Sequence, residues 1–210
     1  HEMAKLLLLM GLIPVFISFI ARKFLSDRIV RKEGGSEMSI SGHEMIERIL
    51  KKGRAVDVEI QVKKRLFMIL GPTRLVVSPS LAESRKARDV AEAGILAGLV
   101  LMARRQEKVV SWRKWAVKFG SAMPAFTMIV MAFAMVIGRL SPTLCLGVVA
   151  ASLGFATAFL WFTLPVERAA AGTVAEMLEE TALVSRRSEG EAIASLVRAL
   201  GWRRIVPGAI

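Results

Sequence analysis

Cysteine and histidine are scarce in this chain of 210 residues, which contains one cysteine, Cys145, and two histidines, His1 and His43. A single cysteine excludes an intrachain disulfide. A tight zinc site in a protein needs several His, Cys, Asp or Glu ligands in compatible geometry, and one internal histidine does not supply them. The composition therefore argues against a disulfide scaffold and against a histidine-rich metal centre.

Two other catalytic patterns are also missing. No glycine-rich phosphate loop of the P-loop or Rossmann type occurs, and a Ser-His-Asp triad would have to use His43, which no surrounding motif favours. His43 and Glu44 form half of an H-E-x-x-H motif, but the residue four positions after His43 is Glu47. The segment instead predicts a helix with Ser41 as N-cap and Glu44 as capping-box partner, ending at Gly53. A Ser-Lys pair remains open but has no supporting pattern.

Acidic residues are outnumbered, with 18 Asp and Glu against 30 Lys and Arg, so the formal net charge is +12. Such a balance, with Trp112 and Trp115 among basic residues, is compatible with nucleic-acid binding. Beside an apolar segment, however, tryptophan is typical of the headgroup level of a bilayer, and cations there face anionic lipid. We therefore predict membrane lipid as a partner, and no nucleic acid.

Apolar sequence is abundant, and hydrophobic residues make up 54% of the chain. Three runs are long enough, or nearly so, to cross a hydrocarbon core about 30 Å thick as helices. The predicted spans are residues 3–21, 119–138 and 140–166. A fourth run, residues 89–103, is too short and contains Glu92, so it predicts a buried helix of a folded domain.

Basic residues orient the three spans. They follow the first span, precede the second and follow the third, whereas only Arg139 lies between the last two. Because Lys and Arg near span ends mark the cytoplasmic side, we expect an external N-terminus, with residues 22–118 and 167–210 cytoplasmic. Residues 1–2 precede a methionine and are interpreted as an artificial addition.

Residues 22–118 have the pattern of a small α+β domain. Residues 56–62 alternate apolar and polar side chains as a half-buried strand does, and residues 65–70 and 74–79 supply two further strand candidates. Beyond the third span, residues 174–184 and 191–200 predict amphipathic helices. The expected architecture is α+β, mostly helical, with a cytoplasmic domain on a helical membrane anchor.

The order of these segments resembles the bacterial YugP-like membrane zinc metallopeptidases. The resemblance rests on "ISGHEMIERIL", on "RLVVSP" before a buried helix, and on "LPVERAA" after two spans, and it covers residues 40–198. It implies a zincin-like (gluzincin-like) topology in a prokaryotic cell membrane. The family carries H-E-x-x-H on the buried helix and a third ligand, a glutamate, after Leu-Pro-Val.

In this alignment Gly98 takes the place of the first zinc-binding histidine, Leu99 that of the glutamate and Met102 that of the second histidine, while Glu167 matches the third ligand. Glycine has no side chain, leucine has no basic group and methionine offers only a thioether, so one carboxylate remains. The resemblance therefore implies a catalytically inactive pseudopeptidase with no catalytic residue, no metal ligand set and no cofactor. Glu167 fits equally well as a residue that flanks a helix at the membrane surface.

A non-catalytic family member can still bind a protein, through a remnant of the substrate groove. The expected peptide-binding edge consists of Leu75, Val76, Val77 and Ser78. An active peptidase relative or a membrane-protein client would add a strand there.

Three further hypotheses remain open at this point. The chain could be an active membrane hydrolase with an unrecognised metal or catalytic set, such as Glu167 with Glu92 and a residue from a partner. It could instead be a basic membrane tether that binds anionic lipid or acidic partners. Finally, the small residues Ala150, Gly154 and Ala158 permit close helix packing, either within the chain or in an oligomer.

Overall fold

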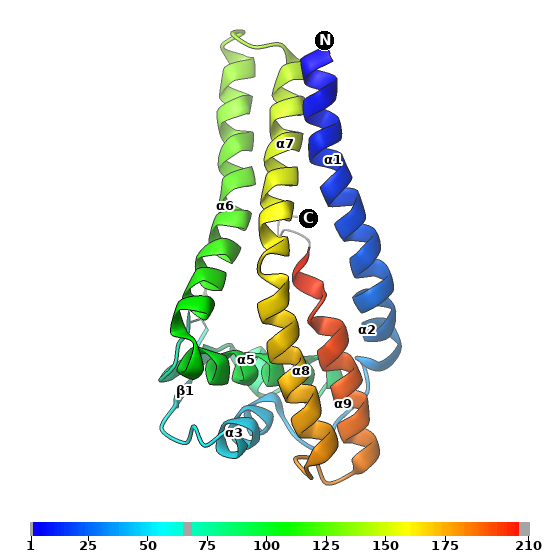
Figure 1. Cartoon of the computed structure of the whole chain (residues 1–210), viewed down its shortest axis with the longest axis vertical. Coiled ribbons are helices and arrows are strands. Elements are labelled where there is room, and N and C mark those ends of the chain that lie inside the picture. The colour runs from blue at the N-terminus through cyan, green and yellow to red at the C-terminus, as the bar shows by residue number, and fades with distance from the viewer. Residues whose placement is uncertain (1, 65–68, 206–210) are drawn as a thin grey trace. The chain divides into compact units, whose positions relative to one another are not determined.

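The computed structural model describes residues 2–64 and 69–205, and Figure 1 traces its elements along the chain. The protein is mostly helical with one small sheet, so the predicted α+β class fits. The chain divides into two compact units. Of the described residues, unit 1 contains 2–23, 113–164 and 204–205, and unit 2 contains 24–64, 69–112 and 165–203.

Unit 1 is built from α1 (Glu2–Arg22), most of α6 (Glu107–Val136) and α7 (Pro142–Trp161). In the described part of the chain, three helical segments are long and apolar enough to cross a membrane: residues 2–33, which begin with α1, and the helices α6 and α7. The sequence predicted three such helices, and this prediction is confirmed. The predicted third span, residues 140–166, is shorter in the structure, because α7 ends at Trp161 and a new helix, α8 (Leu164–Glu180), begins just before Pro165.

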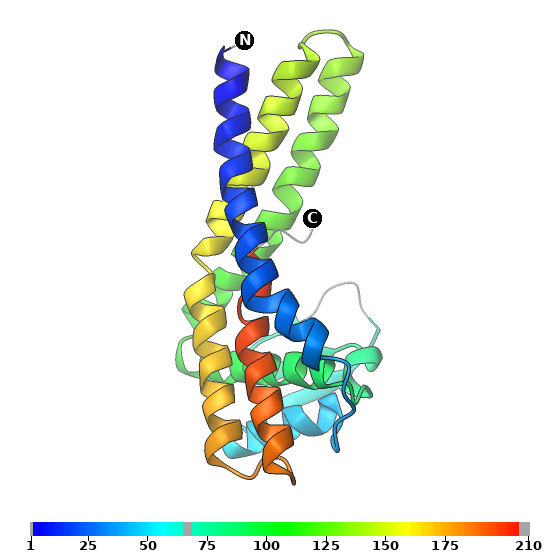
Figure 2. The ribbon, with the colours of Figure 1, turned by 90° about the vertical axis from the view of Figure 1, so that its right-hand side faces the viewer.

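The helices α1 and α7 lie side by side, as Figures 1 and 2 show. Glycines allow this close approach: a Cβ added to Gly11 would overlap the carbonyl oxygen of Ala150, and one added to Gly154 would lie 2.5 Å from the Cα of Gly11. The Trp161 indole also donates a hydrogen bond from Nε1 to Ser18 Oγ at 2.7 Å. The small-residue face of α7 therefore packs against α1 within the chain, so we do not propose an oligomer through it.

Aromatic side chains join α6 to α7 in the same unit. The Trp115 ring stacks on Phe119 with ring centroids 5.1 Å apart and meets Phe159 of α7 edge-on at 5.6 Å. Farther along, Ser152 Oγ donates a hydrogen bond to Thr127 Oγ1 at 3.1 Å. These contacts tie α6 to α7 through side chains rather than through a close backbone approach.

Unit 2 holds the sheet and the remaining helices. After α2 (Arg28–Glu33) and α3 (Gly42–Lys52) come β1 (Glu59–Val62), β2 (Ile69–Leu70) and β3 (Arg74–Val77). The short α4 (Pro79–Ala82), α5 (Ala87–Arg105), α8, α9 (Arg187–Leu200) and a 3₁₀ turn at Arg203–Ile205 follow. The C-terminal helices α8 and α9 thus belong to the same compact unit as the sheet. Residues 65–68 of the predicted second strand lie outside the described residues.

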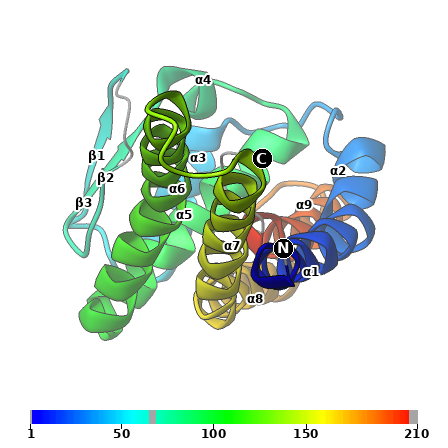
Figure 3. The same cartoon turned by 90° about the horizontal axis from the view of Figure 1, so that it is seen from above.

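The strand order is β1-β3-β2, with β1 parallel and β2 antiparallel to β3. Figure 3 shows the three strands together. β3 is therefore the central strand: Leu75 pairs with Ile60 on one side and Leu70 on the other, and Val76 pairs with Gln61 and Ile69. At Leu75 and Val76 the prediction of an open peptide-binding edge is wrong, because β1 and β2 pair with both sides of β3 there. Val77 pairs with Val62 of β1, and Ser78 follows the end of the strand.

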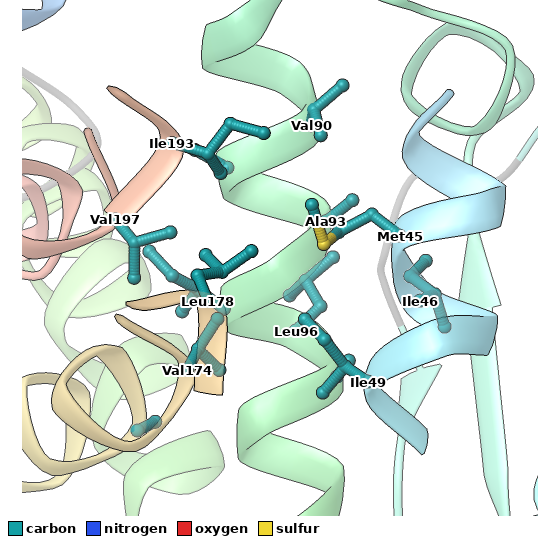
Figure 4. Close-up of a cluster of buried hydrophobic side chains, with 14 of the residues drawn as sticks. Met45, Ile46, Ile49, Val90, Ala93, Leu96, Val174, Leu178, Ile193 and Val197 are labelled. Atoms are coloured by element: carbon teal, nitrogen blue, oxygen red, sulfur yellow. The ribbon is translucent and has the colours of Figure 1, made fainter. Parts of the chain in front are cut away.

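The core of unit 2 surrounds α5. This helix buries 13 of its 19 residues, and it packs against α3 and α9 as well as α8. Figure 4 shows α3 contributing Met45, Ile46 and Ile49 from one side, while Val174 and Leu178 of α8 come from another. A helix apolar on all sides is typical of one enclosed by others, which explains why a short apolar run can be a core element rather than a span.

The helix α3 begins with the predicted capping box. Ser41 Oγ accepts a hydrogen bond from the Glu44 N–H at 3.3 Å, and the Glu44 carboxylate accepts one from the Ser41 N–H at 2.7 Å. The hydrogen bond from the Ser41 backbone lowers the pKa of Glu44 below its usual value. The two backbone N–H groups of the capping box are thus satisfied, and α3 places Met45 and Ile49 in the core.

We expect Ser41→Ala to lower the free energy of unfolding of unit 2 by about 1 kcal/mol at neutral pH, because it removes the acceptor for the Glu44 N–H.

The folded-state pKa of Glu44 is depressed, so the contribution of its carboxylate is present above the ordinary pKa of 4.5 and is lost as the pH falls below it. Thermal unfolding of Glu44→Gln and wild type between pH 7 and pH 3 checks this. A stability difference that grows toward low pH would contradict it.

Candidate functional site

Gly98, Leu99 and Met102 lie on α5, in the most enclosed part of unit 2. Gly98 is buried, Leu99 is completely buried in the core, and Met102 is partly buried against it. Gly98 and Met102 are four positions apart and so share a face of the helix. The structure therefore places these three positions in packed apolar surroundings.

The glycine at position 98 marks a close crossing of α5 and α8. A Cβ at Gly98 would lie 2.6 Å from Val174 Cγ2 and 3.1 Å from the carbonyl oxygen of Ala170. One turn earlier on α5, a Cβ at Gly94 would lie 3.3 Å from Val174 Cγ1. At this crossing α8 fills the space into which a side chain of residue 98 would extend.

Glu167 lies in the first turn of α8 and is only 2% exposed. Ala170 and Val174 follow it at three and seven positions along the helix, so all three share one face of α8. The structure thus brings Gly98 against the face of α8 that carries Glu167. A carboxylate in the first helical turn is also stabilised by the helix dipole, so this position has a structural role whether or not a metal ever binds.

Glu92, which we considered as a partner for Glu167 in an unrecognised catalytic set, lies two turns before Leu99 on α5. Its carboxylate forms an ion pair with Arg203 at 3.5 Å. Within the described residues, no three His, Cys, Asp or Glu side chains come close enough together to hold a metal ion. The residues present therefore do not fit a hydrolytic zinc centre, which needs at least three protein ligands and a base.

A cavity of about 440 Å³ lies elsewhere in unit 2, between α3 and β1. Its wall is formed by Leu50, Ala55, Val58 and Ile60 with the more exposed Val56, and by the polar stripe of α3, His43, Glu47 and Lys51. His43 Nε2 lies 3.3 Å from Glu47 Oε1, and the side chain of His43 is 37% exposed. The internal histidine of the chain thus lines this cavity beside a carboxylate.

Carboxylates beside this cavity are engaged with cations. Asp57 accepts a hydrogen bond from Arg104 at 2.9 Å, and this hydrogen bond lowers the pKa of Asp57 below its usual value. Glu59 lies 4.0 Å from the guanidinium of Arg74. The same region exposes Lys51, Arg54, Lys63 and Lys64, so the surface beside the cavity is basic.

Sequence reasoning missed two features of this region. Gly94 and Gly98 stand at the helical spacing that allows two helices to cross closely, but the partner residue, Val174, is separated from them by two apolar helices in the sequence. No sequence motif marks the cavity beside β1, because its lining combines one face of α3 with residues of the following turn and of β1.

Residues 6–200 match the protein family described as "Putative neutral zinc metallopeptidase". The match covers nearly the whole chain, from α1 to the end of α9. No curated protein and no solved structure matches the chain.

Proposed function

The chain belongs to the neutral zinc metallopeptidase family, and from this premise we propose that it is a pseudopeptidase, a family member that binds a protein without hydrolysing it. The observation that carries the proposal is the crossing of α5 and α8. Val174 and the Ala170 carbonyl occupy the space beside Gly98, where the resembled enzymes carry their first zinc-binding histidine. A histidine at this position would need α8 to move away.

The chemistry of the other positions supports the same proposal. Leu99 offers no group that could deprotonate a water, and Met102 offers only a soft thioether where zinc prefers imidazole. Glu167 supplies one carboxylate, and Glu92 is held by Arg203. A binding or regulatory subunit that acts on an active relative or on a membrane-protein client requires none of the missing groups.

We also infer that the protein is an integral membrane protein of zincin-like topology. Three apolar helices of sufficient length support insertion, and the distribution of Lys and Arg supports an external N-terminus with unit 2 in the cytoplasm. The packing of α3 on α5 beside a sheet with one antiparallel edge strand supports the zincin-like topology. Fusion of a reporter that is active only in the cytoplasm to Gly35 or to Gly138 tests the orientation, since only the fusion at Gly35 should be active.

The direct test of the proposal is the metal content of the detergent-purified protein. We expect far less than one zinc per chain, with the same low value for Glu167→Ala, because one carboxylate without imidazole ligands binds zinc weakly. A relative that carries H-E-x-x-H, purified identically, serves as the positive control. Hydrolysis of a casein substrate measured on the same samples should be absent for this chain and present for the relative.

One outcome would overturn the proposal. Near-stoichiometric zinc in the wild-type protein that disappears in Glu167→Ala would mean that an active centre assembles around α8 from other residues. The hydrolase hypothesis would then replace the pseudopeptidase.

A further inference from the structure

The outer edge of β1 carries backbone groups directed away from the sheet. The N–H groups of Glu59 and Lys63 donate to the carbonyl oxygens of Thr73 and Val77, at 2.9 and 3.0 Å. Since successive residues of a strand alternate in direction, the N–H and C=O groups of Ile60 and Val62 are directed to the other side. No strand in the described part of the chain pairs with that side of β1.

The cavity of about 440 Å³ lies next to this edge. Ile60 belongs to both features, because its backbone lies on the open edge and its side chain lines the cavity. Leu50, Ala55 and Val58 form an apolar, buried wall. A strand that paired with β1 would therefore have an apolar recess within reach of its side chains on one face.

Positive charge surrounds the edge. Four exposed cations have no ion pair within the described residues: Lys51, Arg54, Lys63 and Lys64. Of the carboxylates in the same region, Asp57 and Glu59 lie beside Arg104 and Arg74, and Glu47 lies beside His43, so one carboxylate without a permanently charged partner faces four such cations. The uncompensated charge beside β1 is therefore positive, which favours an acidic binding partner.

We propose that the β1 edge binds an extended, acidic segment of a partner protein by strand addition. The backbone of the segment pairs with Ile60 and Val62, an apolar side chain enters the cavity, and carboxylates approach Lys51 and Lys63. This surface is separate from the α5–α8 crossing. The inference therefore does not depend on whether the chain binds zinc, and it supplies a specific surface for the binding role.

A peptide explains these features better than a lipid headgroup does. A headgroup would use the cations alone, whereas the regularly spaced N–H and C=O groups of an open strand edge and an adjoining apolar recess are what an extended peptide uses. Strand edges left unpaired also tend to pair with another chain.

The test uses the full chain in nanodiscs of phosphatidylcholine and a fluorescein-labelled peptide of alternating valine and glutamate. We expect saturable binding in an anisotropy titration, and binding at least about tenfold weaker when lysine replaces each glutamate of the peptide. Lys51→Glu combined with Lys63→Glu should weaken binding similarly. Arg186→Glu, a charge reversal at an exposed arginine before α9, should have no effect.

Strand pairing is tested at Val62, whose N–H is directed away from β3. Val62→Pro removes this donor while keeping the hydrogen bonds between β1 and β3, and Val62→Ala keeps the donor but shortens the side chain. We expect binding to be at least about tenfold weaker for Val62→Pro than for Val62→Ala, with the same thermal midpoint for both variants.

Two results would refute the proposal. Equal peptide affinity of Val62→Pro and Val62→Ala, together with loss of binding on charge reversal, would identify a charged surface of the kind that also binds anionic lipid. Absence of saturable binding to the acidic peptide would exclude the surface as a docking site for such segments. Neither result would alter the zinc content that tests the pseudopeptidase proposal.

Discussion

Gly98→Ala is expected to destabilise unit 2, whereas Gly172→Ala is expected to stabilise it. An added Cβ at Gly98 would lie 2.6 Å from Val174 Cγ2 and 3.1 Å from a backbone oxygen, so the packed helices would have to separate, at about 1–3 kcal/mol. At Gly172, inside α8, a Cβ would meet no atom within 4 Å. The gain in helix propensity there is about 0.5–1 kcal/mol. Thermal unfolding of both variants in the same detergent gives the comparison.

The opposite signs make Gly172 a matched control, because both glycines are replaced by alanine in neighbouring helices. Gly98→His should destabilise more than Gly98→Ala, and addition of Val174→Ala should recover part of the loss, since the two residues are in direct contact. Equal stability of Gly98→His and wild type would show that α8 can move away from residue 98 at little cost in free energy. The main structural support for the pseudopeptidase proposal would then be lost.

Gly11→Leu is expected to have the largest effect on unit 1. The Cβ of residue 11 would overlap the carbonyl oxygen of Ala150, and a backbone atom cannot rotate away as a side chain can. We expect a loss of more than about 3 kcal/mol, beyond the usual cost of overpacking, because two helices in close contact must move apart. A lower unfolding midpoint and earlier tryptic cleavage of α1 would measure this loss.

Ala132→Leu provides the control for Gly11→Leu. Ala132 is exposed on α6, so a larger apolar side chain there meets no packed neighbour. We expect its unfolding midpoint to equal that of the wild type. Similar midpoints for Gly11→Leu and Ala132→Leu would mean that α1 and α7 are not held together by the glycine contacts.

The sequence predicted the elements that depend on local patterns. Ser41 and Glu44 form the capping box because the two side chains and the backbone groups they bind lie within one helical turn. The three apolar helices follow from run length, and α5 was distinguished from them by its shorter run and by Glu92. These features need no knowledge of where distant segments lie.

Features that depend on spatial order were predicted less well. β3 is the last strand in the sequence, but it lies between β1 and β2, because β2 turns back antiparallel while β1 pairs on the other side. The continuous apolar run Leu75–Val77 indicates a strand buried on both faces but does not tell an edge strand from a central one. The edge strands of the described sheet are β1 and β2, and β3 is central.

The surroundings of the candidate site also depend on spatial order and could not be predicted from the sequence. The alignment of Gly98, Leu99 and Met102 with a zinc motif came from sequence order alone, and it gave the positions but not their surroundings. That Val174 and Ala170 fill the space at Gly98 follows from a crossing of helices separated by α6 and α7. The cavity next to β1 could not be predicted for the same reason, because its lining residues come from a helix, a turn and a strand that share no sequence motif.

The pairing of α1 with α7 also determines the order in which the protein can be assembled during synthesis. Ser18 and Trp161, which are hydrogen-bonded to each other, are 143 residues apart, so the first helix is made long before its neighbour exists. Until α7 has been synthesised, the Gly11 face of α1 lacks its native packing partner. A ribosome that stalls before Pro142 would therefore release a chain whose first apolar helix lacks its native neighbour, and such products should be preferred substrates for quality-control proteases.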